Sequence, residues 1–129
     1  MLSFISSLGQ DSEAFAIFVN ENYEYKDRSH VLQKSMIEKI NSFTRLLKTK
    51  KNKEEVCYFD ISHKQKCFII KVKSKLSSFS PQENGGNFYS YLKKIDGIKK
   101  IDLYPDSLDL DQEKIVNYFS QFIFGFNLK

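Results

Sequence analysis

Two segments in the middle of the chain are apolar at nearly every position, and they limit the folds that the chain can adopt. Val56–Ile61 and Cys67–Val72 are short and rich in β-branched and aromatic residues, a pattern that favours strands. Strands without alternation of apolar and polar residues belong to the centre of a sheet that is covered on both faces. The sequence therefore predicts two central strands in a sheet with helices on each side.

Three further strands are predicted from other apolar segments, at Leu2–Ser6, Ala14–Val19 and Lys99–Tyr104. With three helices they give the order β-β-α-β-β-α-β-α over a single domain, residues 1–129. Helices spaced among strands favour a three-layer α/β fold with a mixed sheet of about five or six strands.

The three helices are predicted from helical spacing of apolar residues and from capping signals. The first covers residues 29–48, with Ser29 as its N-cap. The second covers residues 80–94 and opens with a capping box from Ser80 to Glu83. The third begins near Asp109, whose carboxylate is placed to cap it. The residues of this last helix that are expected to face inward are Ile115, Val116, Phe119, Phe122, Ile123 and Phe126.

Gly85 and Gly86 lie inside the second predicted helix, where each costs about 1 kcal/mol relative to alanine. Such a cost needs compensation. We expect the helix to approach a neighbouring strand closely at this pair.

The two cysteines of the chain, Cys57 and Cys67, are expected to be buried free thiols. A hairpin that turns through residues 62–65 places Cys57 near Ile70 and Cys67 near Asp60, an offset that opposes a disulfide. Neither thiol has a paired base in the sequence, so neither has the setting of an activated nucleophile.

Residues that commonly carry chemistry are sparse, and none has the neighbours that a known site requires. His30 and His63 lack a second ligand at zinc spacing and are expected in surface loops. The chain has no P-loop, no dinucleotide fingerprint and no nucleophile elbow. An acidic run lacks the glycine and the distant glutamate of a calcium loop, so helix capping is the expected role of Asp106, Asp109, Asp111 and Glu113. We therefore predict no catalytic residue, no metal ligand and no cofactor site.

Positive charge is concentrated in residues 45–75, which hold ten Lys and Arg against three Asp and Glu, whereas the whole chain has a net charge of only +4. Such asymmetry is typical of a nucleic-acid face. The simpler explanation is that lysine is common throughout the chain because it shares A/T-rich codons with Asn, Ile, Phe and Tyr. Tyr23, Tyr25, Tyr89 and Tyr91 are candidates for the surface, but they are scattered away from this segment. If DNA binds, the contacts expected are Lys48, Lys50, Lys51 and Lys53.

The chain contains no apolar run near the roughly 20 residues that cross a bilayer, and its start lacks the pattern of a signal peptide. We expect a soluble, cytoplasmic protein without membrane contact.

The end of the last predicted helix is apolar on more than one face, since Phe124 and Leu128 fall off the inward stripe. A free terminal helix normally keeps one polar side, so another surface is expected to cover these residues. A continuation of the chain beyond Lys129 would supply that surface.

The order of these elements resembles the N-terminal domain of the leucyl aminopeptidases, the cytosol aminopeptidases of the M17 type. The resemblance extends over nearly all of the chain but is diffuse. It rests on the strand at Ala14–Val19, the lysine-rich connector into Val56–Ile61, the Gly85-Gly86 helix, and a last helix that reaches Gly125 before bulky residues. One departure is the segment Lys71–Ser74, where the family often has a glycine-rich turn.

The resemblance implies a macro-domain-like fold and a homo-hexameric parent hydrolase that removes N-terminal residues from peptide substrates. That metallopeptidase would use two divalent metal ions, zinc or manganese, held by a C-terminal catalytic domain following residue 129. None of that domain's signature occurs here, so no catalytic residue is carried over. The implied role of residues 1–129 is non-catalytic, in assembly and in access to the active site. The alternative is a free-standing basic module that binds nucleic acid or a small ligand.

Overall fold

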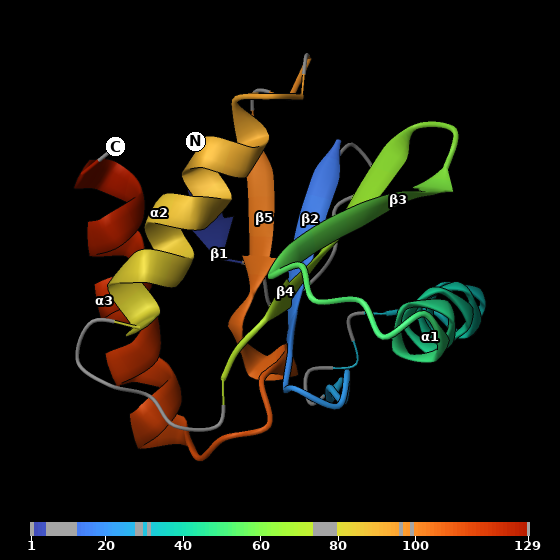
Figure 1. Cartoon of the computed structure of the whole chain (residues 1–129), viewed down its shortest axis with the longest axis horizontal. Helices are drawn as coiled ribbons and strands as arrows, with labels where there is room; N and C mark the ends of the chain where they lie inside the picture. The colour runs from blue at the N-terminus through green and yellow to red at the C-terminus, as the bar shows by residue number, and fades with distance from the viewer. Residues whose placement is uncertain are drawn as a thin grey trace.

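One mixed sheet of five strands forms the centre of the molecule, in the order β1-β5-β2-β4-β3 (Figure 1). The computed structural model describes residues 2–4, 13–27, 30, 32–73, 80–95, 97–98 and 100–128. Strand β3 is antiparallel to β4, and the other neighbouring pairs are parallel. The strands are β1 (Leu2–Phe4), β2 (Ala14–Val19), β3 (Val56–Ser62), β4 (Gln65–Lys71) and β5 (Ile101–Tyr104).

Helices cover both faces of this sheet, with α2 (Ser80–Leu92) and α3 (Gln112–Leu128) on one face and α1 (Lys34–Thr49) on the other (Figure 1). A short 3-10 helix, η1 (Pro105–Ser107), joins β5 to α3. The predicted α/β class and element order are therefore confirmed. No helix in the described ranges is both long and apolar enough to span a bilayer.

Two clusters of apolar side chains form the core, one on each face of the sheet. Phe18, Phe68 and Phe88 belong to the cluster under α2 and α3. Phe15 and Ile17 belong to the cluster under α1. All six residues of β2 have an exposed fraction of 0% because this strand has neighbours on both edges and helices over both faces.

Strand β3 lies at one edge of the sheet, so the prediction of two central apolar strands is wrong for this one. Its side chains are apolar because α1 covers one of its faces and Tyr91 of α2 contacts the other, where the rings of Tyr58 and Tyr91 lie 6.1 Å apart. Sequence pattern reports how many faces of a strand are covered. It does not report whether both edges are paired.

Two helix starts differ from the prediction. Gln33 is the N-cap of α1 and makes no side-chain capping bond, while the predicted cap, Ser29, lies outside the described residues.

Helix α3 is capped by Asp111, whose Oδ1 accepts the backbone N–H of Lys114 at 2.9 Å. Asp109 instead lies before the helix and pairs with Lys26 at 3.2 Å. Helix α2 begins at Ser80, but the side chain of this residue, and hence the predicted capping box, is not described.

A β-bulge shifts the register of the β3–β4 hairpin by one residue. Ser62 pairs with Gln65 as the predicted turn requires, but the ladder changes register between Asp60 and Ser62. Cys57 therefore lies opposite Ile69, and Cys67 opposite Phe59. Both thiols are free, as predicted. Only Cys67 is fully buried, whereas Cys57 is half-buried because it lies near the sheet edge.

Helices α2 and α3 are in backbone contact where two glycines face the opposite helix. A Cβ at Gly85 would lie 2.8 Å from the backbone N of Phe126 and closer still to the carbonyl O of Phe122. A Cβ at Gly125 would lie 2.7 Å from Cα of Gln82. Gly85 of the Gly85-Gly86 pair thus serves a close approach, but to helix α3 and not to a strand as predicted.

We predict that Gly85→Ala and Gly125→Ala each lower the free energy of unfolding by about 3 kcal/mol, because the clashing atoms are backbone and only separation of the helices relieves the clash. Urea denaturation would measure the loss. The control is Ser90→Ala on the exposed side of α2, where a change below about 0.5 kcal/mol is expected. Alanine variants as stable as the parent would contradict the glycine contact.

Candidate functional site

The carboxyl ends of β2, β4 and β5 lie where a sheet of this type usually binds its ligand. Open α/β sheets bind ligands where neighbouring parallel strands send their connections to opposite faces. Strand β2 continues toward α1 and its neighbour β5 continues toward α3, so this switch point lies between these two strands, at the lower edge of the sheet in Figure 1.

The protein's own residues fill this crevice. Ser107, at the end of η1, has an exposed fraction of 0%. Its Oγ accepts the backbone N–H of Phe18 at 2.8 Å and donates to the carbonyl O of Tyr104 at 2.5 Å. The carbonyl O of Ser107 accepts the backbone N–H of Lys26 at 2.9 Å. One serine thus ties β2, β5 and the segment after β2 together.

A second set of hydrogen bonds closes the same edge. The hydroxyl of Tyr104, which is fully buried, donates to Oδ1 of Asp27 at 2.6 Å. The other oxygen of Asp27 accepts the backbone N–H of Leu32 at 3.3 Å. These polar groups are satisfied inside the protein, so a ligand could use them only by displacing η1 and breaking these bonds.

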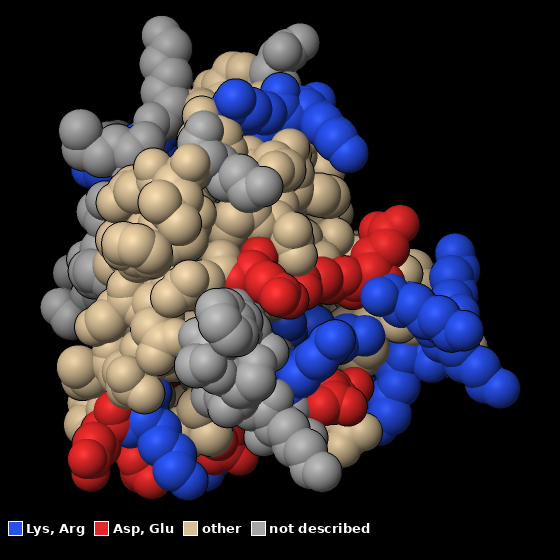
Figure 2. All heavy atoms as spheres, turned by 60° about the vertical axis from the view of Figure 1, so that its left-hand side comes forward, with Lys and Arg blue, Asp and Glu red and all other residues tan. Residues whose placement is uncertain are grey.

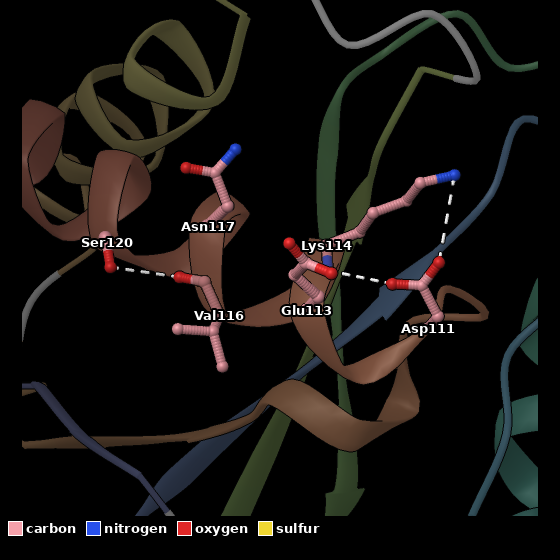
Figure 3. A pocket seen from close by; sticks show the side chains of 6 residues that line it. All are labelled: Asp111, Glu113, Lys114, Val116, Asn117 and Ser120. Atoms are coloured by element: carbon pink, nitrogen blue, oxygen red, sulfur yellow. Dashed lines mark hydrogen bonds and ion pairs between the residues drawn. The ribbon is translucent and has the colours of Figure 1, made fainter.

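The acidic residues that precede and begin α3 have structural roles. Figure 3 shows Asp111 beside Lys114 at the start of the helix, with both interactions between them drawn: the capping bond at 2.9 Å and an ion pair at 3.8 Å. The hollow seen there is lined by exposed residues of one helix side, and Ser120 in its wall donates to the carbonyl O of Val116 at 3.0 Å. Within the described part of the chain, no three His, Cys, Asp or Glu side chains are grouped as a metal site requires.

The histidines and cysteines also lie apart from any assembled site. His30 and His63 are exposed, as predicted for loop residues. Burial raises the pKa of the Cys67 thiol well above its usual range. Burial also raises the pKa of Cys57, although the amide of Asn52, which lies 3.1 Å from Sγ, partly opposes the shift. Both shifts reduce the fraction of thiolate, the nucleophilic form of cysteine, at neutral pH.

The four lysines singled out in the sequence lie together in and beside the connector from α1 to β3. Lys48, Lys50, Lys51 and Lys53 are all exposed, and none forms an ion pair with another described residue. Asn52 fixes this connector, because its carbonyl O accepts from Nζ of Lys71 at 3.2 Å and from the hydroxyl of Tyr23 at 3.2 Å. Figure 2 shows the largest group of Lys and Arg at the right-hand side of the view, beside Asp and Glu, and further Lys and Arg at the top and the lower left.

The tyrosines differ from the surface positions considered for them. Tyr23 is 9% exposed and its ring lies 4.5 Å from Nζ of Lys71. Tyr25, Tyr89 and Tyr91 are half-buried. Among the described residues, these tyrosines therefore form no flat aromatic platform for bases beside the four lysines.

Sequence reasoning missed Ser107 and Asp27 because each bonds to residues far along the chain. The one local signal is Pro105, which starts a tight helical turn and carries Ser107 inward. Comparison of the chain with protein-family models, with curated proteins and with solved structures gave no match.

We predict that Ser107→Ala lowers the free energy of unfolding by about 2 kcal/mol, because the buried N–H of Phe18 then loses its acceptor. Thermal or urea denaturation would measure the change. Ser120→Ala, which removes an exposed hydroxyl from α3, is the matched control and should change stability by less than about 0.5 kcal/mol. Equal stability of the Ser107 variant and the parent would show that the crevice is not held closed by this bond.

Proposed function

We propose that this chain is the non-catalytic N-terminal domain of a metal-dependent leucyl aminopeptidase of the M17 type. The parent enzyme removes N-terminal amino acids from peptides with two manganese or zinc ions held in a following catalytic domain. Residues 1–129 serve the assembly of a homo-hexamer and access to its active sites. The finer fold we propose is macro-domain-like.

The observation that carries this proposal is the apolar surface at the end of α3. Phe124 is 55% exposed and Leu128, one turn later, is 67% exposed. Side chains at this spacing lie on one side of a helix, so together they form a patch that favours contact with another apolar surface. In the family that the sequence resembles, this helix leads into the catalytic domain, which gives the patch a partner.

The closed crevice supports the same proposal. Hydrogen bonds of Ser107 and Tyr104 occupy the place where a small ligand would bind in an α/β sheet of this type. A domain whose ligand crevice is filled by its own residues acts through its surface. Assembly and shielding of another domain are functions that need a surface alone.

The test is a double variant, Phe124→Ser with Leu128→Ser, in the full-length protein that the gene encodes. If these side chains are buried between domains, the variant loses about 3 kcal/mol of association or more, which is roughly a hundredfold in affinity. Analytical ultracentrifugation and leucine-amide hydrolysis with Mn²⁺ would measure assembly and activity. We expect smaller assemblies and reduced turnover.

The matched control is Val116→Ser, because Val116 is 64% exposed on the first half of the same helix, although the sequence pattern placed it inward. It should leave assembly unchanged. The purified 129-residue chain should not hydrolyse leucine amides with Mn²⁺ or Zn²⁺. Turnover by this chain, or a gene product without aminopeptidase activity, would contradict the proposal.

A second candidate function is nucleic-acid binding by a free-standing module, and the four exposed lysines favour it. Lys48, Lys50, Lys51 and Lys53 have no acidic partner among the described residues, so their charge is available to phosphates. Because such lysines release counterions from DNA, affinity would fall steeply with salt.

For this candidate we predict that Lys50→Glu with Lys51→Glu and Lys53→Glu weakens DNA binding by at least about tenfold and flattens its salt dependence. Fluorescence polarisation with a labelled duplex at low and moderate salt would measure both. Lys94→Glu, an exposed lysine after α2, is the control and should have little effect. Absence of salt-dependent binding by the parent chain would remove this candidate.

A further inference from the structure

The turn at the end of α1 holds a lysine where helices usually have glycine. The N–H of Asn52 donates to the carbonyl O of Leu47 at 3.0 Å, and the N–H of Lys51 donates to the carbonyl O of Lys48 at 3.1 Å. These two bonds form a Schellman motif, in which the residue before the last adopts the left-handed conformation and is usually glycine. Here that residue is Lys51, with a φ of 51°. Because a Cβ is crowded in this conformation, the native state loses stability at Lys51.

Lys51 differs from the other described non-glycine residues that have a positive φ. Tyr23 has a φ of 62°, but its ring lies 4.5 Å from Nζ of Lys71 and its hydroxyl donates to the carbonyl O of Asn52. His30, with a φ of 52°, belongs to a residue type that is enriched in this conformation. Lys51 is exposed, and its ammonium forms no hydrogen bond or ion pair with another described residue. No described contact of the side chain therefore compensates for the strain of its backbone.

Composition and helix electrostatics do not account for this lysine. Asparagine shares A/T-rich codons with lysine and adopts the left-handed conformation more readily, and the chain has it at the next position, Asn52. A lysine also stabilises the carbonyl end of a helix, but this effect is confined to the last turn, where Lys48 supplies the charge. Lys51 adds a positive charge beyond that turn. Backbone strain of this kind is typical of positions that serve a function.

Asn52 fixes the backbone that carries this charge. Besides its bond to Leu47, its carbonyl O accepts from Nζ of Lys71 and from the hydroxyl of Tyr23, both at 3.2 Å. Its side-chain amide donates to Sγ of Cys57 at 3.1 Å. These bonds join the connector to α1, to β3, to β4 and to the segment after β2. Since the backbone beside the lysines is already ordered, a ligand loses little affinity to the ordering of the connector.

The acidic residues that follow the lysines are bound to other parts of the fold. Oε2 of Glu55 accepts from the side-chain amide of Asn87, in α2, at 3.0 Å. Oε2 of Glu54 lies 3.8 Å from Sγ of Cys57, in β3. Residues 45–55 still hold five Lys and Arg against these two glutamates. The connector therefore attracts anions, although repulsion from Glu54 should weaken their binding.

We propose that Lys51 is the central phosphate contact of a site on the connector from α1 to β3 that binds the backbone of duplex nucleic acid without reading its bases. Lys50 and Lys53 are the flanking contacts. The ammonium of lysine is a point charge, which suits phosphate oxygens, and phosphate contacts carry no sequence information. Residues 48–55 contain no aromatic side chain on which unpaired bases could stack, so single strands should bind more weakly.

This inference rests on the nucleic-acid function given above as the second candidate. It does not depend on the aminopeptidase proposal, because α1 and α3 lie on opposite faces of the sheet (Figure 1).

The experiment uses the whole chain with Lys51→Asn, a change that removes the charge and relieves the strain. Thermal denaturation should show a Tm higher by about 3 °C. Fluorescence polarisation with a labelled DNA duplex at low salt should show several-fold weaker binding. The slope of log affinity against log salt should fall by about one phosphate contact. Because the variant is more stable than the parent, unfolding cannot explain its weaker binding.

Three further variants separate charge from strain and locate the site. Lys50→Asn is the matched variant, because Lys50 has a φ of −79° and should lose affinity without a comparable rise in Tm. Glu54→Gln should strengthen binding, since it removes a negative charge from the connector. Lys94→Asn, at an exposed lysine after α2, should leave affinity and Tm unchanged.

Failure of the inference can be told apart from failure of the nucleic-acid function. If the parent binds the duplex and Lys51→Asn binds it equally well, or is no more stable, the function stands and the role of Lys51 is overturned. If the parent shows no salt-dependent binding, both are overturned. A strong preference between duplexes of unrelated sequence would also overturn the proposal, as would tighter binding to single strands or to vesicles of anionic lipid.

Discussion

The contact between α2 and α3 determines much of the remaining structure, because it fixes where α3 lies on the sheet. Gly85 and Gly125 allow the two backbones to touch, and the buried hydroxyl of Tyr118 donates to Asn84 beside this contact at 3.0 Å. Helix α3 then places Phe119 against Phe18 of β2, with ring centres 4.6 Å apart. Since only residues 108–111 separate η1 from α3, the same placement helps to hold Ser107 in the crevice between β2 and β5.

A filled crevice changes what a sheet of this kind can do. In open α/β sheets the carboxyl ends of the strands are the usual ligand site, and here Ser107, Tyr104 and Asp27 use that space for internal hydrogen bonds. The described surface has three distinctive parts, which are the apolar end of α3, the lysines between α1 and β3, and the open edge of β3. These lie on different elements, so each can act without the others.

The sequence was sufficient to predict the element order, because periodicity and capping residues are local signals. Ala14–Val19 was predicted with its observed limits. Contacts between distant residues were not predictable in the same way. Gly85 was expected to meet a strand, since nothing near it in sequence indicates Gly125, forty residues later. The edge position of β3 was missed because an apolar pattern reports covered faces only. Ser107 was missed because its acceptor role depends on Phe18, 89 residues earlier.

The central claim is that the crevice at the carboxyl ends of β2 and β5 is closed by the protein itself. Native-state hydrogen exchange at the Phe18 amide tests this most directly, because that N–H donates to Ser107. If the crevice is closed, this amide exchanges only through global unfolding, as slowly as the slowest amides of β2 and β4. If it exchanges orders of magnitude faster than those amides, η1 opens locally and the crevice is available to a ligand, which would contradict the account.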